Sequence, residues 1–324
     1  MKSIRHLKFN LSKYTSILIL IGMLIVCSFA EKTFLSVANL TNILRQISIV
    51  TIMAFGETIL IIGGQLDLSV GTNAAMSGTF ACIVFIATGS LALAVLVALV
   101  LGCVVGFLNG AIVTKFNAPP FIVTLAMQQV TLGAIFLYTN GQNVYKIGDF
   151  RIIGQGTFLG IPIPILIMLF IGLITWFLLS KCKFGRYIFA IGGNEKAANA
   201  SGVNVKKVKL IAYCISGTLA GLAGVVLMSR LNAGLPASGT GYETDALTAT
   251  IIGGTSFTGG IGSAWGTLIG SCIIGILNNI MNLLGVQAYL QQILKGALII
   301  IAVVIDIYTK EHKKVVRVVD DVLV

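Results

Sequence analysis

Apolar runs of near-membrane length follow one another along almost the whole chain, and this pattern limits the fold more than any other feature. A helix needs roughly 20 predominantly apolar residues to cross the hydrocarbon core of a bilayer. Of the 324 residues, 56% are hydrophobic and only 10% are charged, whereas a soluble domain carries about 25% charged residues. The sequence therefore predicts one all-α integral membrane domain over residues 1–324.

About ten transmembrane segments are expected. They are residues 15–30, 43–62, 70–88, 91–113, a segment that starts at Pro119–Pro120, 163–180, 210–228, 245–261, 264–284 and 290–307. A cleaved signal peptide is the alternative for the first segment, because a basic stretch precedes it. The many spans that follow favour an uncleaved first helix.

Basic residues are concentrated in one polar interruption, residues 181–209. Seven of the 22 Lys and Arg lie in it, against the single acid Glu195. Loops with such an excess of Lys and Arg face the cytoplasm. Basic stretches also precede the first segment and follow the last, and an even number of segments places both chain ends on one side. We therefore predict that this loop and both termini are cytoplasmic.

The net charge of +11 raises the question of a nucleic-acid partner. A nucleic-acid surface gathers its basic residues on one face. Here they lie between apolar runs, without one patch of interleaved aromatic residues. The expected partner is therefore membrane lipid, with no nucleic acid.

A short helix is predicted inside the 181–209 loop. Asn194 is the expected N-cap, Glu195 lies in the first turn, and Gly202 follows the end. A helix of about two turns is marginal in water and needs a surface that holds it. We interpret it as a docking element, with a solvated loop as the alternative. The candidate docking residues are Gly192, Gly193, Asn194, Glu195, Lys196, Ala197, Ala198, Ser201 and Gly202.

Two acidic residues stand in or beside the second segment. Insertion scales assign roughly 2.5 to 3.5 kcal/mol against an acidic residue at a helix centre and about 0.3 to 0.6 in favour of each Leu, Ile, Phe or Val, so the segment still inserts. Glu57 is therefore a candidate pathway residue, and the alternative is that it accepts hydrogen bonds from a neighbouring helix. Asp67 is predicted to cap the third helix, with a proton relay as the alternative.

Uncharged polar residues form stripes on two segments. Thr124, Gln128 and Thr131 share one face of the fifth segment, because they stand at i, i+4 and i+7. Asn278 and Asn282 share a face of the ninth, with Asn279 beside it. Such weak donors and acceptors suit a route that a hydroxylated solute crosses without being retained. Interhelical hydrogen bonds are the alternative.

Small residues and missing motifs complete the pattern. Glycines recur every four residues at Gly102, Gly106 and Gly110, and again at Gly262, Gly266 and Gly270, which indicates close helix packing in lipid. The chain has no GxxxxGK[ST] loop for phosphates and no HExxH motif. Its six cysteines have no CxxC spacing. We expect no catalytic, cofactor-binding or metal-binding residues.

Several long strings resemble a known family. GRYIFAIGGNEKAANASGVNV, GTGYETDALTATIIGGTSFTGG, LNNIMNLLGV, IIGGQLDLSVG and PPFIVTLAMQQVTLGAIFLYTNGQ resemble the permease subunit of ribose-type ATP-binding-cassette (ABC) sugar importers. The likeness covers most of the chain, with the motifs in the same order. It implies a type II importer-like permease in the bacterial plasma membrane.

The resemblance also implies partners. A homodimer or heterodimer of permeases would form the route, an extracytoplasmic binding protein would deliver a monosaccharide such as ribose, and a separate ATPase subunit would bind ATP and dock on the coupling helix within 181–209. The alternative is an ion-coupled secondary sugar transporter that acts alone, with Glu57 and Asp67 as its coupling carboxylates and a discontinuous helix at Gly253–Gly260.

Overall fold

The computed structural model describes residues 15–322, and nearly all of its secondary structure is helical. The helices are α1 (Thr15–Ala30), α2 (Val37–Ile62), α3 (Val70–Thr88), α4 (Leu91–Phe116), α5 (Pro120–Thr139), η2 (Gly148–Arg151), α6 (Ile152–Gln155), α7 (Ile163–Ser180), α8 (Lys183–Gly193), α9 (Glu195–Ala200), α10 (Val205–Leu231), η3 (Pro236–Gly239), α11 (Tyr242–Ile252), α12 (Ala264–Leu283) and α13 (Ala288–Val322). A small antiparallel hairpin joins β1 (Thr157–Phe158) to β2 (Ile161–Pro162). The basic stretch before residue 15, used in the predicted orientation, lies outside the described residues.

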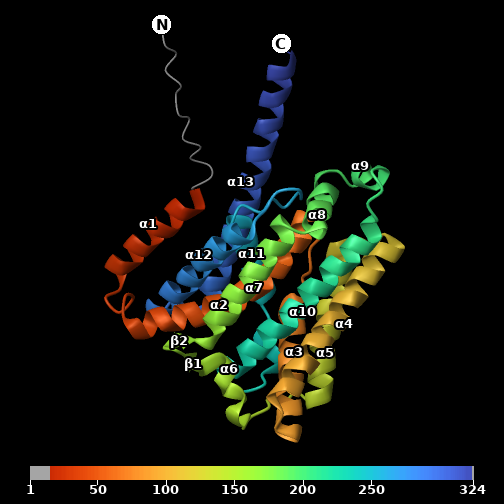
Figure 1. Cartoon of the computed structure of the whole chain (residues 1–324). Helices are drawn as coiled ribbons and strands as arrows, with labels where there is room; N and C mark the ends of the chain where they lie inside the picture. Colours follow the sequence, from red (N-terminus) through yellow and green to blue (C-terminus); the bar gives the residue numbers. More distant parts are fainter. Residues whose placement is uncertain (1–14, 323–324) are drawn as a thin grey trace.

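Within residues 15–322, seven helices are long and apolar enough to cross a membrane: α2, α3, α4, α5, α7, α10 and α12. Shorter apolar stretches lie in α1 and in the first half of α13, at Ala288–Val304. Figure 1 shows the first residues of α1 and the far end of α13 on the same side of the bundle as α8 and α9. The chain is therefore an all-α membrane protein, as its composition predicts.

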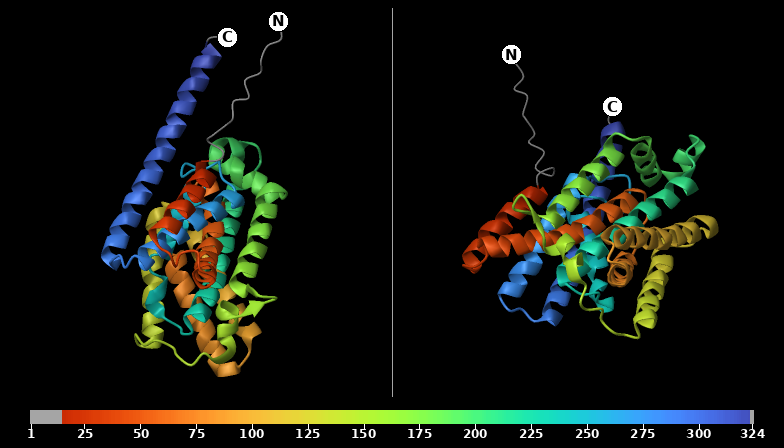
Figure 2. Two further views of the ribbon diagram at one scale, coloured as in Figure 1. Left: turned by 90° about the vertical axis from the view of Figure 1, so that its left-hand side faces the viewer. Right: turned by 60° about the horizontal axis from the view of Figure 1, so that its bottom comes forward.

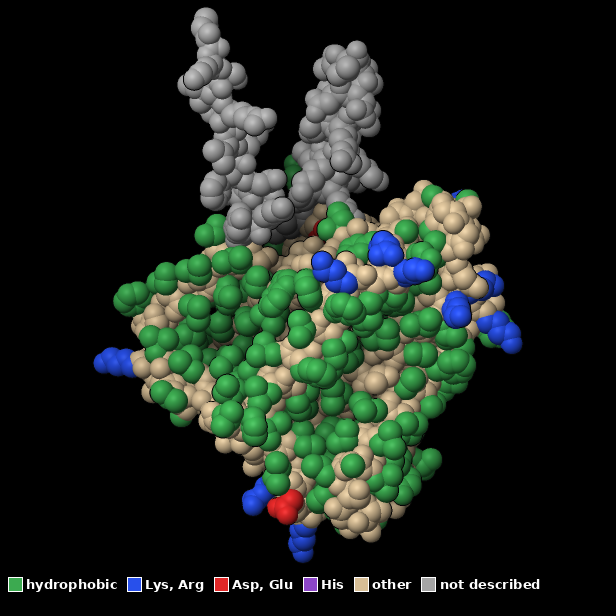
Figure 3. Space-filling view, in the orientation of Figure 1, with side chains coloured by type: hydrophobic (Ala, Val, Ile, Leu, Met, Phe, Trp, Pro, Cys, Tyr) green, Lys and Arg blue, Asp and Glu red, His purple; other side chains and the backbone are tan. Residues whose placement is uncertain are grey.

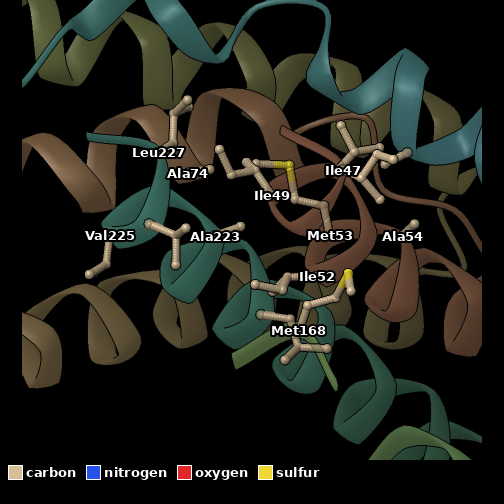
Figure 4. Close-up of a cluster of buried hydrophobic side chains, with 14 of the residues drawn as sticks. Ile47, Ile49, Ile52, Met53, Ala54, Ala74, Met168, Ala223, Val225 and Leu227 are labelled. Atoms are coloured by element: carbon tan, nitrogen blue, oxygen red, sulfur yellow. The ribbon is translucent and has the colours of Figure 1, made fainter. Parts of the chain in front are cut away.

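The core is centred on α2, α3, α7 and α10. Ile49, Ile52 and Met53 of α2 are almost fully buried and lie near Ala223 of α10 and Met168 of α7 (Figure 4). From Ile47 to Ile62 every residue of α2 is buried. A helix that is apolar on all sides belongs inside a bundle and away from lipid, so α2 is the central helix that the others surround.

Glycines bring α4 and α10 into backbone contact. A Cβ atom added at Gly102 would meet the carbonyl of Gly217, and one added at Gly217 would meet the carbonyl of Gly102. Gly106 lies equally close to Tyr213. The predicted small-residue packing is confirmed here, and on α12 too, where Gly266 and Gly270 face α11.

The segment predicted as a helix over 245–261 is shorter and starts earlier. After α10, residues 232–241 run without an α-helix, and α11 then covers only Tyr242–Ile252. Gly254, Gly259 and Gly260 have φ values of +88°, +83° and +76°. These left-handed conformations end the helix, and a loop over 253–263 joins α11 to α12. The prediction of a helix as far as residue 261 was wrong because these glycines turn the chain.

Surface charge follows the ends of the bundle. Figure 3 shows a broad hydrophobic band across the visible face, with Lys and Arg side chains gathered at the upper edge over α8 and α9, a few charges at the lower end and one Lys or Arg side chain at the left-hand edge. A broad band with so few charges matches the part of the surface that faces lipid. In Figure 2, α13 runs along the outside of the bundle.

Candidate functional site

The polar interruption at 181–209 contains two helices, of which the sequence predicted one. Helix α8 (Lys183–Gly193) buries Gly185, Ile188 and Ile191. Gly192 and Gly193 are its last two residues, whereas we expected them in a loop before the short helix. A Cβ at Gly192 would collide with the carbonyl of Ile62, so Gly192 already packs against the chain's own backbone.

Helix α9 is the predicted short helix, with the predicted cap. Asn194 Oδ1 accepts a hydrogen bond from the Ala197 N–H over 3.0 Å, and Gly202 follows the helix with φ +83°. Ala198 is buried, and the residues around it are exposed. Glu195 Oε2 forms an ion pair with Lys209 Nζ of α10 over 2.8 Å. α9 is thus a small protruding helix that is anchored at one side chain and tied at its first turn.

A groove of about 880 Å³ opens beside α9. Lys196 and Asn199 of α9 and Lys206 of α10 line one side, and Asn117 and Pro119 of the α4–α5 turn line the other. Apolar residues such as Val113 and Pro120 line the groove together with the basic residues. The groove gives the protruding helix a recess that a partner surface can enter.

Glu57 of α2 and Asp67 of the α2–α3 turn meet in the interior of the bundle, beside α4. Both side chains are about 1% exposed, and the Asp67 N–H donates to Glu57 Oε2 over 3.4 Å. Asp67 Oδ1 also accepts from the N–H of Ser69 over 2.8 Å, and Asn109 Nδ2 donates to both of its carboxylate oxygens. Glu57 Oε1 has no partner among the described residues. The two carboxylates are therefore held very differently.

Asp67, which the sequence predicts to cap α3, lies just before that helix without being its N-cap residue. The N-cap position of α3 is Ser69, which makes no side-chain capping bond. Asp67 lies two residues earlier; its Oδ1 accepts from the Ser69 N–H at the start of the helix, and both of its carboxylate oxygens accept from Asn109 of α4. Its hydrogen bonds join the α2–α3 turn to α4, which the sequence alone does not show.

The polar stripe of α5 makes contacts inside the bundle. Thr131 Oγ1 lies 2.7 Å from Thr72 Oγ1 of α3, and Gln128 Nε2 donates to Glu243 Oε1 of α11 over 3.1 Å. Thr124 donates to the carbonyl of Pro120 in its own helix. Two of the three predicted residues therefore bond between helices.

The asparagines of α12 lie at three different contacts. Asn278 Nδ2 donates to Asp245 Oδ2 over 3.0 Å, and Asn279 exchanges two hydrogen bonds with Asn39 of α2. Asn282 is exposed and accepts from Gln291 of α13. Asn278 and Gln128 of α5 thus both bond to the first turn of α11, at Asp245 and Glu243, whereas Asn279 and Asn282 contact α2 and α13.

Three charged residues of this region were not predicted as site residues. Lys295 of α13 forms an ion pair with Asp245 of α11, with Nζ 3.0 Å from Oδ1. Glu243 stands in the first turn of α11 and accepts from the N–H of Gly241. Lys295 stands near the middle of the last apolar run, so the rule that a charge inside a span is a functional candidate was sufficient to identify it.

The described part of the chain shows no cluster of metal-ligating side chains. Within residues 15–322, no group of three or more His, Cys, Asp and Glu side chains has the arrangement of a metal site. All six cysteines are free thiols. The site consists of hydrogen-bonding groups and one protruding helix.

A bundle of apolar helices with buried polar contacts and a basic, protruding edge defines a multi-pass membrane permease. The chain belongs to the family described as branched-chain amino acid transport system / permease component, whose model matches residues 39–303. It is a multi-pass protein of the bacterial plasma membrane.

Curated relatives match nearly the whole chain. The ribose import permease protein RbsC of Escherichia coli (strain K12) is 43% identical over 91% of this chain and 94% of its own length. That of Bacillus subtilis (strain 168) is 42% identical over 88% and 89%. The D-allose transport system permease protein AlsC of Escherichia coli (strain K12) is 39% identical over 91% of each chain. No solved structure matches the chain significantly.

Proposed function

We propose that this chain is the membrane-spanning permease subunit of an ABC importer that carries ribose into the cytoplasm. The observation that carries the proposal is its 43% identity, over 91% of its length, to a ribose import permease. Other relatives are named for allose, xylose and arabinose transport, so the monosaccharide class is supported more broadly than ribose itself.

ATP hydrolysis by a separate ATPase subunit would drive transport. That subunit would bind ATP and dock on α9 and in the groove beside it, with Asn194, Glu195, Lys196 and Ala197 exposed toward it. Lys196 and Lys206 line this groove, and such basic residues favour the cytoplasmic side, where an ATPase subunit would find ATP. α9 would then act as the coupling helix, and the permease would need no nucleotide site of its own.

The proposed topology has ten crossings. Three shorter elements join the seven long apolar helices: α1, the apolar half of α13, and α11 together with the irregular residues 232–241 before it. The basic edge over α8 and α9 would face the cytoplasm by the positive-inside rule, and both termini would lie on that side. An extracytoplasmic sugar-binding protein would dock on the opposite end, and a second permease copy would complete the assembly.

Reconstitution tests the function directly. Liposomes that hold this chain with its ATPase, supplied with the sugar-binding protein and ATP, are expected to take up labelled ribose. Liposomes with this chain alone, under a proton or sodium gradient, are the control and are expected to take up none. Gradient-driven uptake by the chain alone would contradict the importer and support an ion-coupled carrier.

A further inference from the structure

Lys295 is a charged residue near the middle of an apolar stretch, and it is not sealed away. It stands inside Ala288–Val304 of α13, which runs along the outside of the bundle (Figure 2). Its side chain keeps 28% of its surface accessible, and that of its ion-pair partner Asp245 keeps 11%. A charge at membrane depth faces protein or a wet cavity, so this pair indicates a place that water-soluble groups reach.

Asn278 lies beside the Asp245–Lys295 ion pair and adds a free hydrogen-bond acceptor to it. Asn278 donates to Asp245, and its own carbonyl oxygen Oδ1 is buried with no partner among the described residues. An unsatisfied buried acceptor is unfavourable. Asn278, Asp245 and Lys295 come from α12, α11 and α13, and together they offer acceptors and a donor at one point.

The first turn of α11 restricts the chemistry of the solute. A helix N-terminus ordinarily attracts anions, but both carboxylate oxygens of Glu243 already accept from the N–H of Gly241 at this end. Asp245 adds a second negative charge to the same turn. A carboxylate on a solute would therefore meet acidic groups at this position.

We propose that Asp245, Lys295 and Asn278 form a solute-contact site on the translocation route, selective for neutral polyhydroxylated molecules. A sugar hydroxyl donates to Asp245 or to Asn278 Oδ1 and accepts from Lys295, so hydrogen bonds to the solute replace the ion pair and satisfy the free acceptor. Without solute, the Asp245–Lys295 ion pair closes the site. This inference rests on the proposed import function and names the residues and the solute class within it.

Thiol labelling tests whether the site is wet. In a background without the six native cysteines, Lys295→Cys is treated with a charged, membrane-impermeant methanethiosulfonate reagent in the reconstituted complex. Ile293→Cys is the matched control, since Ile293 lies on the same helix and is 66% exposed. The expected rate at 295 is at least about tenfold higher, because an ionic reagent is excluded from lipid. Equal or slower labelling at 295 would overturn the inference.

A neutral pair separates contact with solute from a structural ion pair. Lys295→Gln combined with Asp245→Asn removes both charges without leaving either one unpaired. We expect wild-type thermal stability, with ribose uptake reduced about tenfold because the charge-assisted hydrogen bonds to the solute are lost. Ribose uptake by this double variant at the wild-type rate would show that the ion pair is purely structural and would overturn the inference.

Different measurements test the import function and the solute-contact site. Absence of ATP-driven ribose uptake by the wild-type complex would contradict the proposed function, whereas the labelling rate at 295 does not depend on transport. Uptake by the wild-type complex together with slow labelling at 295 would contradict only the contact site.

Discussion

Lys209 of α10 and Glu195 of α9 form an ion pair over 2.8 Å, and this contact ties the first turn of the protruding helix to the long helix that follows it. The Glu195 side chain is 55% exposed, so solvent weakens the attraction. Exposed pairs of this kind contribute about 0.2–1 kcal/mol. The cap at Asn194 and the buried Ala198 therefore hold α9 in place more than the ion pair does.

Asn194→Ala is expected to weaken association of the ATPase. Loss of an N-cap destabilises a helix by about 1 kcal/mol, which corresponds to roughly a fivefold weaker affinity if the ATPase binds the folded α9. Co-purification or surface-immobilised binding measures the change. Asn194→Asp keeps an acceptor at the same position and is expected to restore binding. An Asn194→Ala complex of wild-type affinity would show that α9 is not the docking element.

Gly217→Val is expected to separate α4 from α10. The new side chain would collide with the carbonyl of Gly102, and overpacking of this kind typically destabilises by about 1–3 kcal/mol. The melting temperature in detergent should fall. Gly296→Ala on α13 is the matched control, because nothing lies within 4 Å of its added Cβ atom. Equal melting temperatures for the two variants would contradict the close packing described.

Asp67→Asn is expected to destabilise the protein, whereas Glu57→Gln is expected to leave both stability and uptake unchanged. The Asp67 carboxylate accepts from Ser69 and from Asn109, and hydrogen bonds to a charged group contribute about 1.5–3 kcal/mol. Glu57 accepts a single long contact from Asp67, which an amide oxygen also accepts.

Thermal unfolding and ribose uptake of the two variants measure these effects. Normal expression of Glu57→Gln with loss of uptake would contradict a structural role and place Glu57 on the solute route. The same loss in Asp67→Asn without a lower melting temperature would contradict the structural role of Asp67.

Ser229→Ala is expected to loosen the connection between α5 and α7. Ser229 Oγ accepts from the N–H of Gly154 and donates to the carbonyl of Phe150, each over 2.6 Å. Without the hydroxyl, two buried backbone groups lose their partner, which costs about 1–3 kcal/mol for each group left unsatisfied. Faster proteolysis within residues 140–162 measures the effect. Ser238→Ala, in the neighbouring 232–241 segment, serves as a comparison.

The membrane helices were largely predictable, because several apolar runs are bounded by the residues that begin or end the helix. α3 and α7 have the predicted bounds, because Gly89 adopts a left-handed conformation and Pro162 precedes α7. α10 extends beyond the predicted 210–228 at both ends: Asn204 caps its start, and Asn232, in a left-handed conformation, follows its last residue. Hydropathy predicts only the apolar part of a helix. The capping residues determine where the helix ends, and these can lie beyond the apolar part.

Contacts between distant residues were not predictable from spacing. Asp245 and Lys295 lie fifty positions apart, and only the packing of α13 on α11 brings them together. Asp67 fitted the pattern of a helix cap, but Asn109 of α4 provides a partner that one segment cannot reveal. α8 was missed because its glycines and basic residues are typical of loops, although its apolar residues share one buried face.

Gly192 of α8, Ile62 of α2 and Gly260 after α11 touch one another through their main chains, and the Gly260 N–H donates to the carbonyl of Ile62 over 2.8 Å. Side chains absorb small displacements by changing rotamer, and here there are none between the three strands of backbone. A displacement of α8 is therefore transmitted directly to α2 and to the 253–263 loop. The two displacements should be nearly equal in size.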